Sequence, residues 1–187
     1  MTQDTWLFIN SFAPWLSAIG TIAAVFVALY LARRDKTIRL KVSAGHRLII
    51  TPGRSGPDPE YIAIKIVNIG HRDAQVTGIG WKTGLFEKRY FKQLINSNEF
   101  SSILPIRLHD GEEANYYISL NKETNWLENF SEKMISPPFQ RLQVHFIKLQ
   151  VFTSVGKTIE TTIETNLKKK LIEVINRNEH LARISHR

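Results

Sequence analysis

An uncharged apolar run, Ala13 to Ala32, constrains this chain more than any other stretch of its sequence. From Pro14 onward, the run would span about 28 Å as a helix, at about 1.5 Å per residue. The hydrocarbon core of a bilayer is about 30 Å thick, so this length suits one crossing. A core helix of a soluble domain carries a polar stripe, whereas Ser17 and Thr21 are the only polar side chains before Tyr30. We therefore predict a transmembrane helix over residues 13–32.

The flanks of this run predict an uncleaved anchor with its N-terminus outside. Every Lys and Arg lies at or after Arg33, and the residues before it carry only Asp4 as a charged side chain. A cleavable signal peptide has a basic start and a small-residue cleavage site, and both are poorly matched here. The positive-inside rule places the basic side in the cytoplasm. We expect a short extracytoplasmic tail at residues 1–12, a bacterial inner-membrane location and a cytoplasmic domain from residue 33.

Small and basic residues along this segment are candidates for helix and lipid contacts. Gly20, Ala24 and Ala28 recur every four residues and form a stripe on one helical face. Because such stripes let two backbones approach closely, the pattern predicts a homodimer, with chance spacing as the alternative. Arg33, Arg34 and Lys36 follow the span and are candidates for binding anionic lipid.

Composition limits the chemistry of the rest of the chain. The sequence has no cysteine, which excludes a disulfide framework, a zinc-thiolate site and a cysteine nucleophile. All 25 Lys and Arg residues and 16 of the 17 Asp and Glu residues follow Ala32, so this part carries a formal charge of +9. A domain with this charge is attracted to anionic surfaces, of which the inner leaflet is the nearest.

Alternating apolar and polar residues predict a mainly β domain over residues 33–165. The strongest strand is 61–67, and a strand at 74–81 is expected as its antiparallel neighbour. The turn Val155-Gly156-Lys157 predicts a hairpin. Further strands are expected at 37–44, 46–51, 86–91, 103–108, 114–120, 141–155 and 158–165. We expect these strands to form an antiparallel β-sandwich of about seven to nine strands.

The run from Ile64 to Gly70, followed by Ala74-Gln75-Val76, resembles the V-x-N-x-G…V pattern of bacterial immunoglobulin-like β-sandwich domains. The resemblance covers about residues 60–82 and implies a fold rather than a function. In that pattern Asn and Gly shape the turn between strands, which implies a backbone role for Asn68. The whole layout also resembles that of small uncharacterised bacterial single-pass inner-membrane proteins.

Two helices complete the expected architecture. The first is a short helix over 122–134, capped by Asn121. The second is a basic amphipathic helix over 166–187, which either packs on the sandwich or lies on the membrane. Its candidate anionic-lipid residues are Lys168, Lys169 and Lys170. A solvated outer face and an acidic protein partner stay open as alternatives, while nucleic acid is not expected because base-stacking aromatic residues are missing.

No motif in the sequence predicts a catalytic, cofactor or metal site. The six histidines lack a ligand spacing such as H-x-x-x-H. The residues from His109 to Glu113 match a turn better than a cation loop, and neither a phosphate-binding glycine loop nor a G-x-S-x-G elbow occurs.

The expected function is therefore a membrane-anchored, non-enzymatic interaction or sensing module that binds a protein partner or a small ligand. The alternative is a membrane effector of a bacterial stress or phage-defence system. In that alternative, the transmembrane helices self-associate and perturb the bilayer, so overexpression would be toxic only with residues 14–32 present. An enzyme ranks third.

Overall fold

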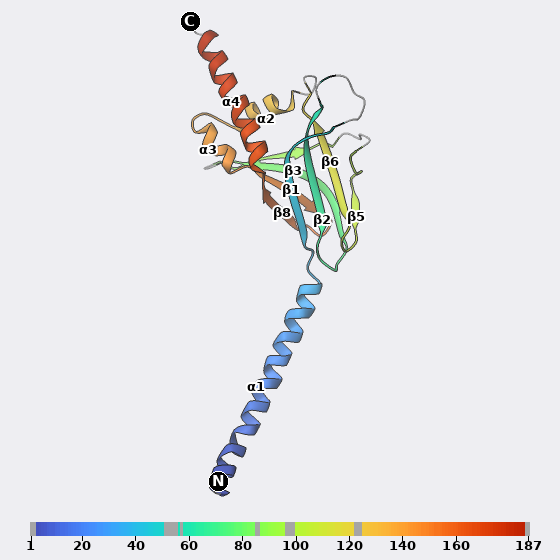
Figure 1. Cartoon of the computed structure of the whole chain (residues 1–187), viewed down its shortest axis with the longest axis vertical. Coiled ribbons are helices and arrows are strands. Elements are labelled where there is room, and N and C mark those ends of the chain that lie inside the picture. Colours follow the sequence, from blue (N-terminus) through green and yellow to red (C-terminus); the bar gives the residue numbers. More distant parts are fainter. Residues whose placement is uncertain are drawn as a thin grey trace. The chain divides into compact units, whose positions relative to one another are not determined.

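The computed structural model describes residues 3–50, 56, 58–84, 87–95, 100–121 and 125–185. Two compact units make up the chain, Met1–Ile38 and Arg39–Arg187. The first unit is formed by helix α1 (Gln3–Asp35). The second unit, Arg39–Arg187, is mainly sheet and carries three helices (Figure 1).

Helix α1 contains a segment, Pro14–Arg34, that is long and apolar enough to cross a membrane. None of its most apolar stretch is buried in the protein. The helix begins at Gln3, so most of the expected tail at 1–12 is helical. Pro14 therefore lies inside the helix rather than at its start, where the predicted transmembrane helix over residues 13–32 would place it.

Sheet A consists of β1 (Leu40–Leu48), β2 (Glu60–Asn68) and β6 (Glu113–Ser119), in the order β1-β2-β6. Both pairs are antiparallel. The predicted alternation of β2 is confirmed, because Ile62, Ile64 and Ile66 are buried while Lys65 is exposed. One strand, β1, replaces the two that were expected at 37–44 and 46–51.

Sheet B is antiparallel and centred on β3 (Ala74–Thr83). On one side β3 pairs with β4 (Arg89–Gln93) and, further along, with β5 (Ile106–Leu108). On its other side lies β7 (Lys148–Thr153), followed by β8 (Thr158–Thr162). The predicted hairpin of β7 and β8 is confirmed, with Gly156 in the left-handed region at φ 76°.

The expectation that β2 and β3 are paired neighbours is wrong, because they lie in different sheets. The buried Asn68 organises the connection between them. Its amide nitrogen donates to the carbonyls of Arg72 (2.9 Å) and Leu108 (3.0 Å), and its amide oxygen accepts from the Gly70 N–H (3.1 Å). These bonds confirm the backbone role expected for Asn68, at a turn that leads from one sheet to the other.

A single hydrophobic core contains residues from both sheets and from the helices. Sheet A contributes Ala44 and the β2 isoleucines, and sheet B contributes Val76, Ile79 and Trp81. Trp81 lies against the aromatic residues of α2 (Trp126–Met134), with ring centroids 5.6 Å from Trp126 and 5.4 Å from Phe130. Both antiparallel sheets are therefore tied to the helical part of this unit.

Helix α2 begins at Trp126, where Asn125 adopts left-handed dihedrals without a side-chain cap. The expected start at residues 122–124 lies outside the described residues, and Asn121 precedes the helix as an exposed residue rather than as its cap. Likewise β4 begins at Arg89, while residue 86, the expected strand start, is outside the described range.

The single long strand expected over 141–155 is wrong, since Gln140–His145 forms helix α3 before β7 begins. Within residues 141–146 of that pattern only Val144 is buried among the apolar residues, whereas Leu142 and Phe146 are exposed. The Gln143 side chain fixes this segment locally, because it accepts from the Ser136 N–H (3.2 Å) and donates to the Ser136 carbonyl (2.8 Å).

Helix α4 (Thr165–Ser185) packs against β1, α2 and α3 along its first half, as the first of the two expected placements requires, while lipid contact by its exposed end stays a prediction. Leu167, Leu171, Val174 and Ile175 are buried. At its start, Asn166 accepts from the His46 N–H (3.2 Å) and donates to the His46 carbonyl (3.0 Å). Helices α2, α3 and α4 gather at one end of the sheets (Figure 1).

Candidate functional site

The predicted helix-packing residues lie on one exposed face of α1. Gly20, Ala24 and Ala28 are all exposed, and apart from the neighbouring backbone of α1 no described atom lies within 4 Å of where a Cβ on Gly20 would sit. This face is therefore sterically open to a second helix. Dimerisation through these residues stays a prediction.

The basic residues at the end of α1 are also exposed. Arg33 and Arg34 occupy the last turn, where cations interact favourably with the helix dipole. Thr37 donates its hydroxyl to the Arg33 carbonyl (2.9 Å), and Lys36 lies between them. Lipid binding by Arg33, Arg34 and Lys36 stays a prediction.

The three consecutive lysines of α4 do not share one environment. Lys169 is exposed, whereas Lys168 and Lys170 are half-buried. The Lys170 ammonium lies 2.9 Å from the Glu60 carboxylate, which also contacts His46 Nε2 at 2.8 Å. The hydrogen bond from Lys170, with a smaller one from His46, lowers the pKa of Glu60. Lys170 therefore helps to hold α4 against sheet A.

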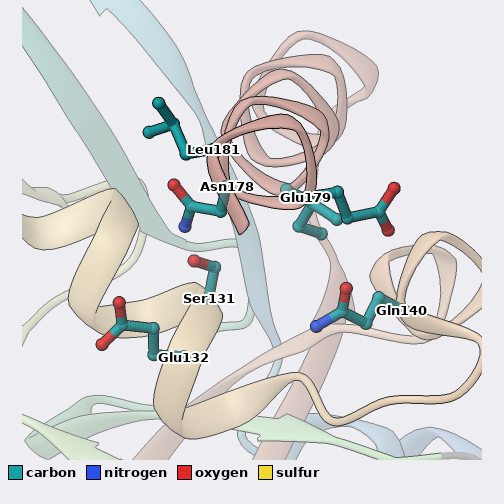
Figure 2. A pocket seen from close by; sticks show the side chains of 7 residues that line it. Ser131, Glu132, Gln140, Asn178, Glu179 and Leu181 are labelled. Carbon is teal, nitrogen blue, oxygen red and sulfur yellow. The ribbon is translucent and has the colours of Figure 1, made fainter. Parts of the chain in front are cut away.

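A cavity of about 370 Å³ lies between α2, α3 and α4. Figure 2 shows its lining, where Ser131 and Asn178 face each other and the carboxylates of Glu132 and Glu179 extend to opposite sides. Ser131 donates to the Glu128 carbonyl (2.9 Å), and Glu179 accepts from Arg141 (3.3 Å). The first bond lies within α2, and the second links α3 to α4.

A larger groove, of about 660 Å³, lies on the face of sheet B that points away from the core. Strand alternation places it there, because Ile79 and Trp81 point into the core and Gly78 and Gly80 therefore point out. We call it the glycine groove. Its lining residues are Thr77, Gly78, Tyr90, Phe91, Lys92, Gln150, Phe152 and Thr158.

Gly78 lines the groove, and together with Gly80 it leaves this face of β3 without a side chain between β4 and β7. The Phe152 ring extends across both of them. A Cβ on Gly78 would meet Phe152 and Lys92 at ordinary contact distances, 3.6 and 3.7 Å. A Cβ on Gly80 would lie 2.7 Å from the Phe91 carbonyl oxygen and 3.0 Å from the Phe152 ring.

Beside the groove, a cluster of charged and polar side chains surrounds Glu160 and contacts the Tyr90 ring. The Glu160 carboxylate accepts from Lys82 (2.6 Å), Gln150 (3.0 Å) and Lys148 (3.3 Å). The bond from Lys82, reinforced by those from Gln150 and Lys148 and opposed by desolvation, lowers the pKa of Glu160 to about 2. Lys82 also lies 5.9 Å from the centroid of the Tyr90 ring, a cation–π distance.

A second hollow, of about 230 Å³, continues from the glycine groove past the end of β4. It shares Thr77, Gly78 and Lys92 with the groove and extends to Leu94 and Ile103, which are 78% and 75% exposed. β4 ends at Gln93, opposite Ile79, and β5 begins at Ile106, opposite Val76. The hollow therefore covers the point where the two edge strands leave β3.

Histidine and carboxylate side chains also pair on the second unit, away from the glycine groove. His71 lies 2.8 Å from Asp110, and His109 lies 3.0 Å from Asp73, which also binds Arg107. The hydrogen bond from His109 lowers the pKa of Asp73, together with the charge of Arg107. Among the described residues, no group of three or more His, Cys, Asp or Glu side chains is arranged to hold a metal ion.

Sequence reasoning missed the glycine groove. A signal for it was present, since Gly78 and Gly80 are two residues apart in a predicted strand and must therefore share one face. What the pattern could not supply was the identity of the neighbouring strands, whose Tyr90, Lys92 and Phe152 form the walls.

No protein-family model matches the chain, and no curated protein does either. Among solved structures, the crystal structure of the "Putative ApaA Protein" from Bordetella pertussis is similar at 17% identity and a TM-score of 0.32, covering 69% of this chain and 91% of that one. The X-ray structure of the structural genomics target SoR45 is similar at 10% identity and a TM-score of 0.28, covering 70% of this chain and 84% of that one.

Proposed function

We propose that this protein is a single-pass membrane protein whose second unit is a non-enzymatic interaction module. The observation that carries the proposal is the unburied apolar segment Pro14–Arg34. Its large side chains, such as Trp15 at 72% exposure, have no cover within the described chain. As a helix its 21 residues span about 31 Å, which matches the hydrocarbon core of a bilayer.

The charge asymmetry supports an orientation with the N-terminus outside and the second unit in the cytoplasm of a bacterium. Arg33 and Arg34 end the apolar segment, and no Lys or Arg precedes them. Positive residues are retained on the cytoplasmic side of the inner membrane during insertion. The second unit then lies close to the inner leaflet.

An interaction role is supported by the surface of sheet B. Exposed apolar side chains, among them Tyr90, Leu94 and Ile103, border the two connected hollows. Contiguous exposed apolar surface on a folded domain is typical of a binding site for another molecule. An immunoglobulin-like arrangement of the two sheets is part of the proposal, supported by the Asn68 turn that joins β2 of one sheet to β3 of the other.

Membrane fractionation tests the anchor. The full chain, expressed in bacterial cells, is expected in the membrane pellet after an alkaline carbonate wash. A Val25→Arg/Val27→Arg variant should move to the soluble fraction, because each central arginine costs about 2.5–3.5 kcal/mol on insertion. Val155→Arg, in the exposed turn between β7 and β8, is the matched control and should stay in the pellet. Release of the unaltered chain by carbonate would contradict the proposal.

A further inference from the structure

Strand β4 leaves one edge of sheet B open. In the described part of the chain β3 is the only strand that pairs with β4, and four of its five residues are exposed. The edges of sheet A differ. The Glu164 N–H donates to the Ala44 carbonyl of β1 (2.9 Å), and the Ser102 N–H donates to the Asn115 carbonyl of β6 (2.8 Å).

We infer that β4 binds an extended, acidic segment of a partner protein, which adds a strand to sheet B beside the glycine groove. The inference rests on the proposed function and names its partner class. Main-chain hydrogen bonds to an open edge supply affinity in this mode, while pockets for alternate side chains supply specificity.

Charge identifies the occupant as acidic. Lys88, Arg89 and Lys92 lie on or next to β4, and all three are exposed. Among the described residues, neither Lys88 nor Lys92 forms an ion pair. Glu160 of β8, a carboxylate of the same sheet, is already engaged by Lys82 and Lys148. Carboxylates on an added strand would supply the missing partners.

The same charges disfavour a second copy of this chain as the occupant. Pairing β4 with β4 of another copy would bring two sets of three cations together across one strand spacing of about 4.8 Å. Like charges placed opposite each other in a sheet destabilise the pair. A partner with glutamate or aspartate avoids this repulsion.

The glycine groove provides the apolar pocket that such a mode requires. Side chains of an added strand alternate between the two faces of the sheet, so every second one reaches the outer face. On that face Tyr90 and Lys92 of β4 border the hollow above Gly78, and Phe152 closes its far side. The ligand class is therefore an extended peptide in which apolar and acidic residues alternate.

The test uses the full chain in nanodiscs of zwitterionic lipid. The probes are two fluorescein-labelled eight-residue peptides in which valine alternates with glutamate or with lysine. The glutamate peptide should bind at least about tenfold more tightly, measured by fluorescence anisotropy, because its charge complements the strand edge. Hydrogen exchange should slow at the backbone amides of Arg89–Gln93 when it is bound.

Variants assign the binding to this surface. Lys88→Glu/Lys92→Glu should weaken binding of the glutamate peptide at least about tenfold. Lys169→Glu, an equally exposed lysine on α4, is the charge control and should leave binding unchanged. Gly78→Val should also abolish binding, since its Cβ fits at ordinary distances and its methyl groups enter the groove.

Four results would overturn the inference. The first two are equal binding of both peptides and unchanged binding of the glutamate peptide by the Lys88→Glu/Lys92→Glu and Gly78→Val variants. The third is slowed hydrogen exchange confined to elements other than β4. The fourth is slowed hydrogen exchange at β4 that depends only on protein concentration or on anionic vesicles. The last would assign the edge to a second copy or to lipid. Retention of the same samples in carbonate-washed membranes is scored separately, so a failed peptide test is distinguishable from a failed anchor.

Discussion

Two glycines of β3 share one face of the sheet but differ in their surroundings. Gly78 has ordinary contact distances around its missing Cβ, whereas Gly80 faces a backbone oxygen at 2.7 Å. A backbone atom cannot move away as the end of a side chain can. The same substitution should therefore have different effects at these two positions.

Gly80→Ala is expected to lower the free energy of unfolding by about 1–3 kcal/mol, because the new methyl group overlaps the Phe91 carbonyl and the Phe152 ring. Gly78→Ala should change it by less than about 0.5 kcal/mol. Chemical unfolding of the full chain in detergent, followed by tryptophan fluorescence, measures both. Equal destabilisation by the two variants would contradict the geometry of the groove.

Glu160 makes the stability of sheet B dependent on acid. Its pKa in the folded protein is about 2, below the ordinary value of 4.5, so its ionised form stabilises the fold above about pH 5. This stabilisation is lost as the pH falls from 5 to 2. Because the side chain is partly exposed, we expect Glu160→Gln to cost about 1 kcal/mol at pH 7.

The pH dependence of the free energy of unfolding tests this contribution of Glu160. Between pH 5 and 2, Glu160→Gln should lose stability less steeply than the unaltered chain. Glu132→Gln, an exposed carboxylate that forms no ion pair within the described residues, should keep the original slope. An unchanged slope in Glu160→Gln would show that the pairs with Lys82 and Lys148 do not stabilise the fold.

At the scale of elements, α4 belongs to the core of the second unit along only part of its length. Leu171 is 1% exposed, whereas Leu181, further along the helix, is 58% exposed. Leu171→Ala should destabilise the protein by about 2–5 kcal/mol, since it removes a buried side chain. Leu181→Ala should change stability by less than about 0.5 kcal/mol. A small effect at Leu171 in thermal unfolding would mean that α4 does not pack on the sheets.

Local pattern predicted most elements but not how they pair. The alternation of β2, the β7–β8 hairpin and the turn role of Asn68 all depend on neighbouring residues, and the sequence was sufficient for them. The pairing of β3 with β4, β5 and β7 depends on contacts between distant segments. Helix α3 was missed because Gln143 and Ser136 fix a turn that apolar alternation does not encode.

The candidate site was harder to predict than the fold for the same reason. The membrane segment is contiguous in sequence, so its candidate residues, such as Gly20 and Arg33, could be named directly. The glycine groove combines β3, β4 and β7, whose side chains meet only after the sheet has formed. Lys170 was predicted to bind lipid because it lies in a run of three lysines. The run alone could not show that Lys170 forms a half-buried ion pair with Glu60 of a distant strand.

At the scale of the whole molecule, the basic residues of α4 are separated from the basic residue at the start of the second unit, Arg39. Within the second unit, α4 starts beside His46, seven residues along from Arg39. At about 3.3 Å per residue, β1 separates these positions by about 23 Å. This exceeds the Debye length of about 8 Å at physiological salt, so the charges at the start of α4 are largely screened from Arg39.

The central claim is that α1 crosses a membrane once and leaves the second unit in the cytoplasm. Because the chain has no cysteine, single-cysteine variants report its topology without background. In intact bacterial cells a membrane-impermeant maleimide should label Gln3→Cys after outer-membrane permeabilisation alone. Lys169→Cys should react only once the inner membrane is also opened. Labelling of Lys169→Cys with the inner membrane intact, or protection of both positions, would contradict the account.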